Sequence, residues 1–491
     1  MVRLGFLAMN RSSSLAQVAS GSVLVALTLA PGVAAAQASP LSRAVVVGGW
    51  SFRPEIEVRT RAEVRTDPVD TGGDVYGSSA VLAEGFGTTL PPIAETRAET
   101  DSQWIVGERA RIGLTVDRGP LTGVFTLQDA RLWGSTETIF LGAGQSELPS
   151  TAPWEAYLDV HTRSGRRAFF RMGRQRVVWG DGRLLGESDW AFTPRSLDAL
   201  RFGVQLGDID LEAMASLLSA PGATPPSVAG TRKPITEGTG AQLYGLDAVW
   251  HVAPLLQLEV TGLARVVREP RPSWLTPGDT FVVDARVFGE HRGFSYAAEG
   301  AYEFGRVATY GDDRPLSAFA LAARAGLETA LPWHLTFGAR GAYASGDDGE
   351  LEPGETQTRF DPILPDERRN IGLMGLYGWS NLIEGSGTVE VRPVEELSVR
   401  AGYTFAALAQ SSGRWVTARL LPVGAVAENG SRVLGHEVDA IVSLTPWEPL
   451  RLEAGYGLFL FGEGGKAILT AANRPADMQH FGYLQATLRA P

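Results

Sequence analysis

The sequence predicts an all-β fold, a transmembrane antiparallel up-and-down β-barrel of about 18 strands with short periplasmic turns and long extracellular loops. Three observations predict it. Apolar and polar residues alternate along many segments of about ten residues, and the connections between these segments alternate between short and long. Beyond residue 38, no apolar run approaches the ~20 residues of a spanning helix. A chain that spans a membrane without helices must close into a barrel, because lipid cannot satisfy unpaired backbone groups.

The first 38 residues are typical of a secretory signal peptide. Arg3 and Arg11 supply positive charge, and an apolar stretch over residues 18–30 is followed by helix-breaking residues 31–32 and by Ala36-Gln37-Ala38. The apolar stretch is short for a signal anchor. Cleavage after Ala38 would leave residues 39–491 as one outer-membrane barrel domain. The chain has no cysteine, which excludes a disulfide framework and a lipid-anchored Cys.

The clearest alternation runs over residues 55–65. Ile56, Val58, Thr60, Ala62 and Val64 share one face, and six charged residues occupy the other. In a soluble sandwich the apolar face would be the core, whereas in a transmembrane barrel it would meet lipid and the charges would face a wet lumen. This strand alone leaves both interpretations open.

The number of strands and the lengths of their connections favour the barrel. Candidate strands lie near residues 52–66, 103–117, 121–133, 154–163, 167–178, 198–206, 209–218, 240–252, 256–267, 279–288, 294–305, 317–330, 334–344, 371–391, 396–409, 434–445, 450–461 and 477–489. Short connections lie at residues 118–120, 207–208, 253–254, 331–333, 393–395 and 446–448. Long connections lie at residues 67–102, 134–153, 179–197, 219–239, 345–370 and 410–433. An even number of strands places both chain ends in the periplasm.

Trp250, Trp333 and Trp447 fall at or beside short turns, where a periplasmic aromatic girdle is expected. The last strand presents Leu484 and Leu488 on an apolar alternate face, consistent with insertion by the barrel-assembly machinery, although the chain lacks a terminal aromatic residue. The long loops over residues 67–102 and 345–370 are rich in carboxylates, which predicts solvated loop surface.

The polar strand faces are rich in arginine. Only two of the 44 basic residues are lysine, and an arginine-lined constriction selects anions, although any wet barrel wall also needs charges of both signs. Arg59, Arg61, Arg109 and Arg400 lie on such faces and are expected to line the pore. The six histidines show no metal-ligand spacing, and no nucleophile elbow or phosphate-binding loop is present. We therefore expect no enzyme activity, no metal and no cofactor.

Several motifs resemble the alginate export family of outer-membrane porins. They are LQDARLW (127–133), RMGRQ (171–175), WGDGRLLG (179–186) with Asp189-Trp190, RSLDALR (195–201), ASGD (344–347), FDP (360–362), GWSNL (378–382) and GHEVD (435–439). The resemblance implies an 18-stranded monomeric barrel with an arginine-rich constriction that passes a polyuronate. It implies that Asp129, Arg131, Arg174, Asp198 and Arg201 also line the pore, the arginines holding carboxylates and the aspartates keeping the site weak enough for release.

Passive transport of an anionic solute or acidic polysaccharide is therefore the leading hypothesis, for a protein of the bacterial outer membrane in contact with lipid and lipopolysaccharide and with no nucleic-acid partner. A general porin is one alternative. A second is an adhesion or surface-display barrel that acts through its acidic loops and has a plugged lumen. A third is a barrel-embedded hydrolase with a Ser near a His such as His161. A TonB-dependent receptor is disfavoured, because its architecture needs twenty-two strands and a plug.

Overall fold

The structure is a computed structural model that describes residues 44–66, 69, 103–133, 151–162, 167–219, 240–268, 278–309, 312–348, 351–420, 422–423, 429–471 and 476–490. All of them belong to one unit, Ser39–Pro491. The predicted signal peptide lies outside the described residues, as does the predicted acidic loop over residues 67–102 except for residue 69.

Eighteen antiparallel strands form the barrel wall in the described part of the chain, and each pairs with the strands that precede and follow it. They are β2 (Trp50–Arg65), β3 (Gln103–Arg118), β4 (Leu121–Leu132), β5 (Thr151–His161), β6 (Ala168–Gln175), β7 (Leu197–Leu206), β8 (Ile209–Ser219), β9 (Ala241–Ala253), β10 (Leu256–Val267), β11 (Gly278–His291), β12 (Phe294–Thr309), β13 (Asp312–Glu328), β14 (Thr336–Ala344), β15 (Leu382–Val394), β16 (Leu397–Leu408), β19 (Val433–Trp447), β20 (Leu450–Phe461) and β21 (Met478–Ala490). The predicted strand number and up-and-down order are confirmed.

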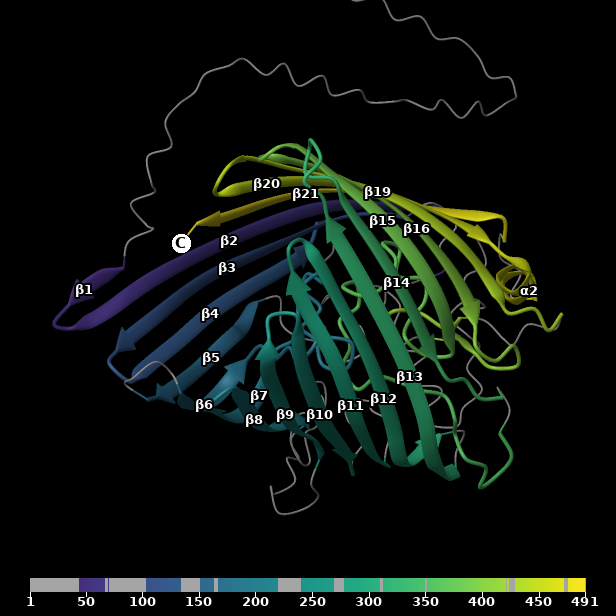
Figure 1. The fold of residues 1–491 in the computed structure, drawn as a ribbon, viewed down its shortest axis with the longest axis horizontal. Helices are drawn as coiled ribbons and strands as arrows, with labels where there is room; N and C mark the ends of the chain where they lie inside the picture. The colour runs from purple at the N-terminus through teal and green to yellow at the C-terminus, as the bar shows by residue number, and fades with distance from the viewer. Residues whose placement is uncertain are drawn as a thin grey trace, which may run out of the picture. The chain divides into compact units, whose positions relative to one another are not determined.

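The barrel closes between its first and last wall strands. β2 pairs with β21 from Ile56, opposite Ala490, to Arg65, opposite Phe481. A short strand, β1 (Val45–Val47), pairs with the start of β2. Figure 1 shows the wall strands following one another side by side. Closure leaves no open sheet edge along the wall, which a membrane-spanning sheet requires.

The alternation in β2 is that of a membrane barrel. Ile56, Val58 and Val64 are exposed on the outer surface, whereas Arg61 and Glu63 are only 2% and 6% exposed. A soluble sandwich would bury the apolar set and expose the charged one. The predicted orientation of this strand is therefore confirmed, with apolar residues toward lipid and charged residues toward the lumen.

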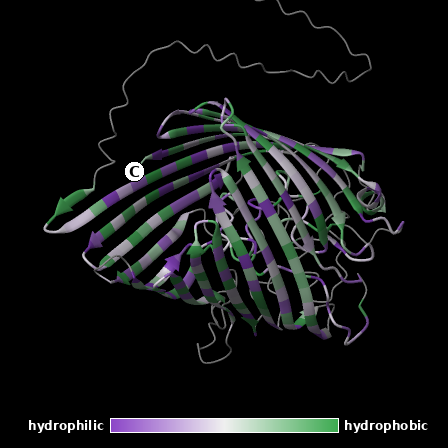
Figure 2. Ribbon diagram, in the orientation of Figure 1, coloured by the Kyte–Doolittle hydropathy of each residue, from purple (hydrophilic) through white to green (hydrophobic). Residues whose placement is uncertain are grey.

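The outer surface of the wall is apolar around the barrel. Leu200, Phe202, Val438 and Leu484 are among many large apolar side chains exposed there. In Figure 2 hydrophobic and hydrophilic residues alternate along the strands. Trp250, Trp333 and Trp447 are all exposed and lie near the short-turn end, which places them where the aromatic girdle is expected.

Short and long connections leave opposite ends of the barrel. The tight turns at Gly119 and Gly207 use left-handed backbone with φ of 59° and 64°, which glycine adopts without strain. One connection departs from the predicted rhythm. β12 ends at Thr309 and β13 begins at Asp312, so only two residues join these strands at the long-loop end.

The strand predicted over residues 371–391 begins later than expected. β15 starts at Leu382, and residues 371–381 belong to a loop that folds into the barrel. Leu376 and Tyr377 are both fully buried although they are adjacent, and adjacent residues of a wall strand face opposite sides. The apolar character of the segment serves loop packing rather than strand pairing.

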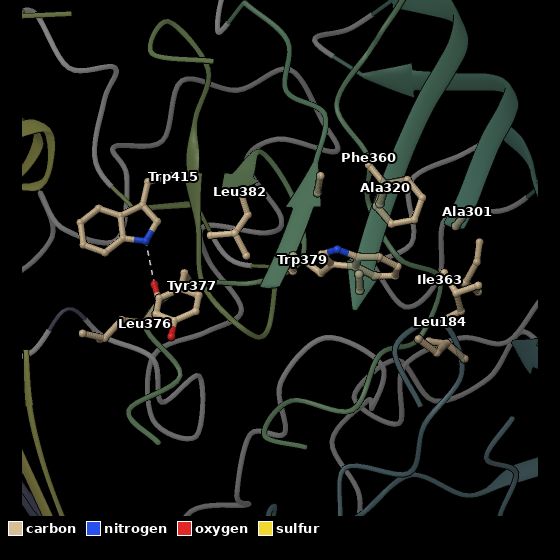
Figure 3. Packing of buried hydrophobic residues seen from close by; sticks show 14 of the residues in the cluster. Leu184, Ala301, Ala320, Phe360, Ile363, Leu376, Tyr377, Trp379, Leu382 and Trp415 are labelled. Carbon is tan, nitrogen blue, oxygen red and sulfur yellow. Dashed lines mark hydrogen bonds between the residues drawn. The ribbon is translucent and has the colours of Figure 1, made fainter. Parts of the chain in front are cut away.

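Three long-loop connections pack together inside the barrel wall, and their described residues are 176–196, 345–348 with 351–381, and 409–420 with 422–423 and 429–432. The third contains β17 (Trp415–Val416) and β18 (Pro422–Val423). Trp415 is buried, and its Nε1 donates a hydrogen bond of 2.7 Å to the carbonyl oxygen of Leu376 (Figure 3). The rings of Phe360 and Trp379 meet edge to face with centres 5.1 Å apart. The loops thus share an apolar core of their own.

A short helix, α2 (Glu463–Ala471), precedes β21 and buries Ile468 and Leu469. No helix among the described residues is long and apolar enough to cross a membrane.

Candidate pore constriction

Residues 176–196, which join β6 to β7, form a loop inside the barrel that we call the strap. Asp189 near one end of the strap contacts β2 and β3, and Asp181 contacts β11 and β13. β11 is the tenth of the eighteen wall strands counted from β2, so these two anchor points lie on opposite sides of the barrel. The strap therefore crosses the lumen.

At the first anchor point, wall arginines bind the Asp189 carboxylate. Arg59 Nη2 lies 2.7 Å from its Oδ2, Arg109 Nη2 lies 3.1 Å from its Oδ1, and Arg111 Nη1 lies 3.7 Å from Oδ1. Arg59 also donates a 2.6 Å hydrogen bond to the Asp189 carbonyl oxygen. Burial raises the pKa of Asp189, but the charges of Arg109 and Arg59 outweigh that effect and hold the pKa at about 2. The carboxylate is therefore ionised at neutral pH.

The same wall carries acids of its own that neutralise these arginines. Glu57 accepts hydrogen bonds from Arg109, from Arg111 at 3.4 Å and from Arg489. Arg61 forms an ion pair of 2.6 Å with Glu63 and donates to the Trp190 carbonyl oxygen at 2.8 Å. The charges of this arginine cluster are thus paired with acids of the protein itself, which is what buried charges require, while Arg59 Nε and Arg111 Nη2 have no hydrogen-bond partner among the described residues.

At the opposite anchor point, Arg324 and Arg286 bind Asp181. Arg324 Nε lies 2.8 Å from Asp181 Oδ2, and Arg286 Nη1 lies 3.0 Å from Oδ1. Burial raises the pKa of Asp181, but the hydrogen bonds and charge of Arg324 overcome it and lower the pKa below its usual range. Both ends of the strap are held by guanidinium–carboxylate contacts of the charge-assisted kind.

The loop segment over residues 351–381 braces the strap. Gly186 N donates to Leu364 O and Leu364 N donates to Leu184 O, both at 2.9 Å, as in a single step of parallel sheet. Arg195 also donates to Leu364 O at 2.8 Å. The strap and this loop therefore act as one constriction, and the predicted solvated surface over residues 345–370 is in part buried, since Asp347 and Glu367 are 2% and 8% exposed.

Beside the braced strap lies a cavity of about 700 Å³, bounded by the wall strands around β16 and by residues 368–373. We call it the cationic vestibule, after Arg368, Arg369 and Arg400, which line it. Glu395 and Glu396 of the β15–β16 turn also line it, so it faces the short-turn end.

Three of the six arginines that line the cationic vestibule keep donor capacity. Within the described part of the chain, neither the Arg369 nor the Arg400 guanidinium has a hydrogen bond or ion pair, and Arg368 Nη1 has no hydrogen-bond partner. Burial and the nearby Arg65 lower the pKa of Arg368 to about 9, so it is still charged at neutral pH. Asp439 is an electrostatic neighbour of Arg400.

The predicted pore-lining residues divide into two sets. Arg59, Arg61, Arg109, Arg201 and Arg400 do face the lumen. Arg59, Arg61 and Arg109 are buried beneath the strap, and Arg201 pairs with Glu212 at 2.6 Å, whereas Arg400 is exposed to the cationic vestibule. Substrate contact by these residues stays a prediction.

The other four, Asp129, Arg131, Arg174 and Asp198, do not line the pore. Asp129 and Arg131 share the outward parity of exposed Phe125 and Leu127 on β4, and they pair with each other at 2.6 Å. Arg174 follows exposed Phe170 and Met172, and Asp198 precedes exposed Leu200 and Phe202; this pair is also 2.6 Å apart. The period of two places all four on the outer surface near the long-loop end.

Sequence reasoning missed Asp181 and Asp189 as strap anchors and Arg368 and Arg369 as lining residues. The strap was expected to be an outside loop, yet it contains the apolar residues Trp179, Leu184, Leu185, Trp190 and Phe192. That composition indicates a packed loop rather than a solvated one. Among the described residues, no group of His, Asp or Glu is placed to hold a metal, and no histidine hydrogen-bonds a serine.

Comparison with known proteins agrees with this architecture. The profile of the alginate export family matches residues 276–474, which confirms the resemblance. No curated protein sequence matches the chain.

Solved structures similar to this fold include Pseudomonas aeruginosa OccK11 (OpdR), with 10% identity, 89% of this chain and 96% of that one covered, and a TM-score of 0.51. Acinetobacter baumannii OccAB2 has 13% identity, 89% and 97% coverage and a TM-score of 0.51. Pseudomonas aeruginosa OpdK with vanillate has 10% identity, 89% and 98% coverage and a TM-score of 0.50. The match to this family profile and the barrel fold support a channel of the bacterial outer membrane.

Proposed function

We propose that this outer-membrane channel, whose residues 276–474 match the alginate export family, passes carboxylate-bearing solutes or a single chain of an acidic polysaccharide through the cationic vestibule and past the strap. The observation that carries the proposal is that Arg368, Arg369 and Arg400 face a cavity of about 700 Å³ with donors that the described protein groups do not use. Arginine donors in a pore wall favour anions over cations.

The strap itself supports the choice of carboxylates. Asp189 and Asp181 are carboxylates inside the lumen, and wall arginines bind both with short contacts. A mobile solute with the same group would find the same chemistry in the cationic vestibule, where the guanidinium fork suits two carboxylate oxygens.

Acidic groups in the same cavity would keep binding weak enough for transport. Glu390 pairs with Arg392 at 2.9 Å, Glu453 pairs with Arg451 at 2.7 Å, and Asp439 lies near Arg400. A solute therefore meets few unneutralised cations at one time. Conduction needs such a compromise between entry and release.

The adhesion hypothesis receives less support from the inward loops. It relies on acidic loops displayed at the surface, but Asp347 and Glu367 are buried within the lumenal loop packing. These carboxylates are not available to a partner outside the cell.

The test is the reversal potential of single channels in a planar bilayer under a potassium chloride gradient. We expect anion preference in the native protein, and a clear reduction in Arg369→Gln with Arg400→Gln. Arg131→Gln is the matched control, because it removes the same charge from the outer surface. Cation preference in the native protein, or equal shifts in the control, would contradict the proposal.

A flux assay then addresses the solute class. Liposome swelling compares uronate oligomers with neutral sugars of equal size, and vanillate, the compound named with the similar OpdK structure, serves as a small carboxylate probe. Faster swelling with the charged members of each pair is expected. Equal rates would point to a general porin.

A further inference from the structure

The outer surface of the barrel carries a hollow over β6 to β12. A groove of about 580 Å³ there is lined almost entirely by apolar side chains. Its floor is made by small residues on two strands, Ala213 and Ala215 on β8 and Gly262 and Ala264 on β10. A Cβ placed on Gly262 would meet nothing within 4 Å. We call this feature the outer groove.

The strand register divides the outer groove lengthwise. Tyr244 of β9 lies opposite Ala215 on one side and Ala264 on the other, and Leu246 lies between Ala213 and Gly262 in the same way. Exposed Leu200 and Phe202 flank one edge, and Phe281 and Phe304 flank the other. Two shallow channels therefore run along the strands on either side of the β9 ridge, a shape that suits extended hydrocarbon chains.

A row of mostly polar residues crosses the outer surface of the wall. It lies one outward-facing position closer to the long-loop end than Tyr244 and its neighbours in the groove. We call it the polar row. Arg306 lies opposite Asp279, Asp279 opposite Val266, and Val266 opposite Gln242. On the far side of β8, Leu217 lies opposite Asp198, and Asp198 lies opposite Arg174. The polar row lies two residues along each strand from the row formed by Ala215, Tyr244 and Ala264, and this spacing is about 7 Å.

Three arginines of this region point outward and hold aspartates on neighbouring strands. Arg174 binds Asp198 at 2.6 and 2.8 Å, Arg306 Nε lies 3.0 Å from Asp313, and Arg268 Nη2 lies 2.8 Å from Asp279. The Arg268 and Arg306 side chains are about half exposed. Each guanidinium has five N–H groups and uses only some of them on its aspartate.

From this placement we propose that the outer groove and its polar row form a binding site for a phosphorylated glycolipid of the lipid A class. Acyl chains occupy the channels beside Tyr244 and Leu246, and the sugar phosphates accept hydrogen bonds from Arg268 and Arg306. The chemistry matches at both levels, hydrocarbon against an apolar hollow and phosphate against exposed guanidinium groups.

The location supports this occupant. The long connections mark the extracellular end of the barrel, and the outer leaflet there carries phosphorylated glycolipid. The aspartates offset the arginine charges, so selectivity comes from directed N–H donors at headgroup height rather than from net charge. The outward-facing groove residues below the row are apolar except for Tyr244, whose hydroxyl donates a 2.8 Å hydrogen bond to Gln242 of the row, so the groove offers the phosphates no deeper charged group.

The experiment is native mass spectrometry of the full chain in detergent, stripped of lipid and titrated with bisphosphorylated lipid A. We expect retention of one lipid A, and about tenfold weaker retention in Arg268→Gln with Arg306→Gln. Ala264→Phe fills a channel without touching charge and should weaken retention as well. The matched controls are Arg131→Gln and Ala440→Phe, on the outer surface of β4 and β19.

Heat-modifiable migration on gels verifies that each variant is a folded barrel. Unchanged retention in both groove variants would overturn the proposal. Equal retention of phosphatidylglycerol would show a general lipid contact and overturn it too, as would a multimer in which a second copy covers the groove. Channel conductance plays no part in this readout, so the result stands apart from the proposed transport function.

Discussion

Replacing Asp189 with asparagine should loosen the strap and raise its rate of opening. The change keeps the side-chain shape and removes the charge that Arg59, Arg109 and Arg111 bind. The pKa of Asp189 is about 2, nearly two units below the ordinary value, which corresponds to about 2.5 kcal/mol. The side chain is 40% exposed, so solvent screening reduces this to about 1–2 kcal/mol.

That free energy predicts a measurable change in gating. A loss of about 1–2 kcal/mol multiplies the ratio of open to closed strap by a factor of about 5–30. Single-channel recordings of Asp189→Asn should therefore show more frequent transitions to a higher conductance. Anion preference should also increase, because three wall arginines lose a counter-charge. Asp129→Asn, which changes an outward carboxylate, is the control.

The sign of the pH dependence follows from the lowered pKa. Asp189 contributes its stabilisation above the unfolded pKa, near 3.9, and loses it as pH falls through about 2. Acidification from pH 7 to 5 should therefore not change the ionisation of Asp189, and the contribution of this residue to the frequency of strap opening should stay constant. If the Asp189→Asn variant folds as a barrel and its recordings are identical to those of the native channel, Asp189 does not hold the strap in place.

Two further predictions concern the inward loops. Trp415→Ala should remove about 3–5 kcal/mol of loop packing, because Trp415 is fully buried and its Nε1 donates to Leu376. Limited proteolysis within the loops should then accelerate while Trp333→Ala, a change at an exposed tryptophan, leaves it unaltered; equal rates in both variants would contradict the packing role. Burial raises the pKa of Asp347 to about 6, so the folded state holds a proton that the unfolded state loses between about pH 4 and 6. The unfolding free energy should fall by up to about 3 kcal/mol as pH rises through that window. The thermal midpoint of Asp347→Asn should exceed that of the native protein at pH 7 and match it near pH 4, and a difference that does not vary with pH would argue against the buried carboxylate.

The barrel wall could be predicted from the sequence because its signal is local. A strand such as β2 carries its orientation in its own alternation, Ile56 and Val58 on one side and Arg59 and Arg61 on the other. The same alternation predicts that Asp129 faces outward, because it shares the parity of Phe125 and Leu127. The pore-lining role given to Asp129 came from resemblance, and the alternation of its own strand was the better guide.

The strap could not be predicted in the same way, because its position depends on contacts far apart in the chain. Asp189 meets Arg59 across 130 residues, and Asp181 meets Arg324 across 143. Neither pairing leaves a periodic pattern. The composition of the strap showed only that the loop is unusually apolar. That indicates a packed loop, but it does not predict which surface the loop packs against.

The two arginine groups of the lumen consequently have different roles. Those of β2 and β3 are neutralised by Asp189, Glu57 and Glu63 while the strap is in place. Arg369 and Arg400 face the cationic vestibule without such partners among the described residues. The field that a solute meets at the short-turn end is therefore set by the vestibule, and the β2–β3 arginines add to it only when the strap leaves them. If the proposed function holds, a solute carboxylate that competes with Asp189 for these arginines favours that departure and thereby promotes the opening of its own path.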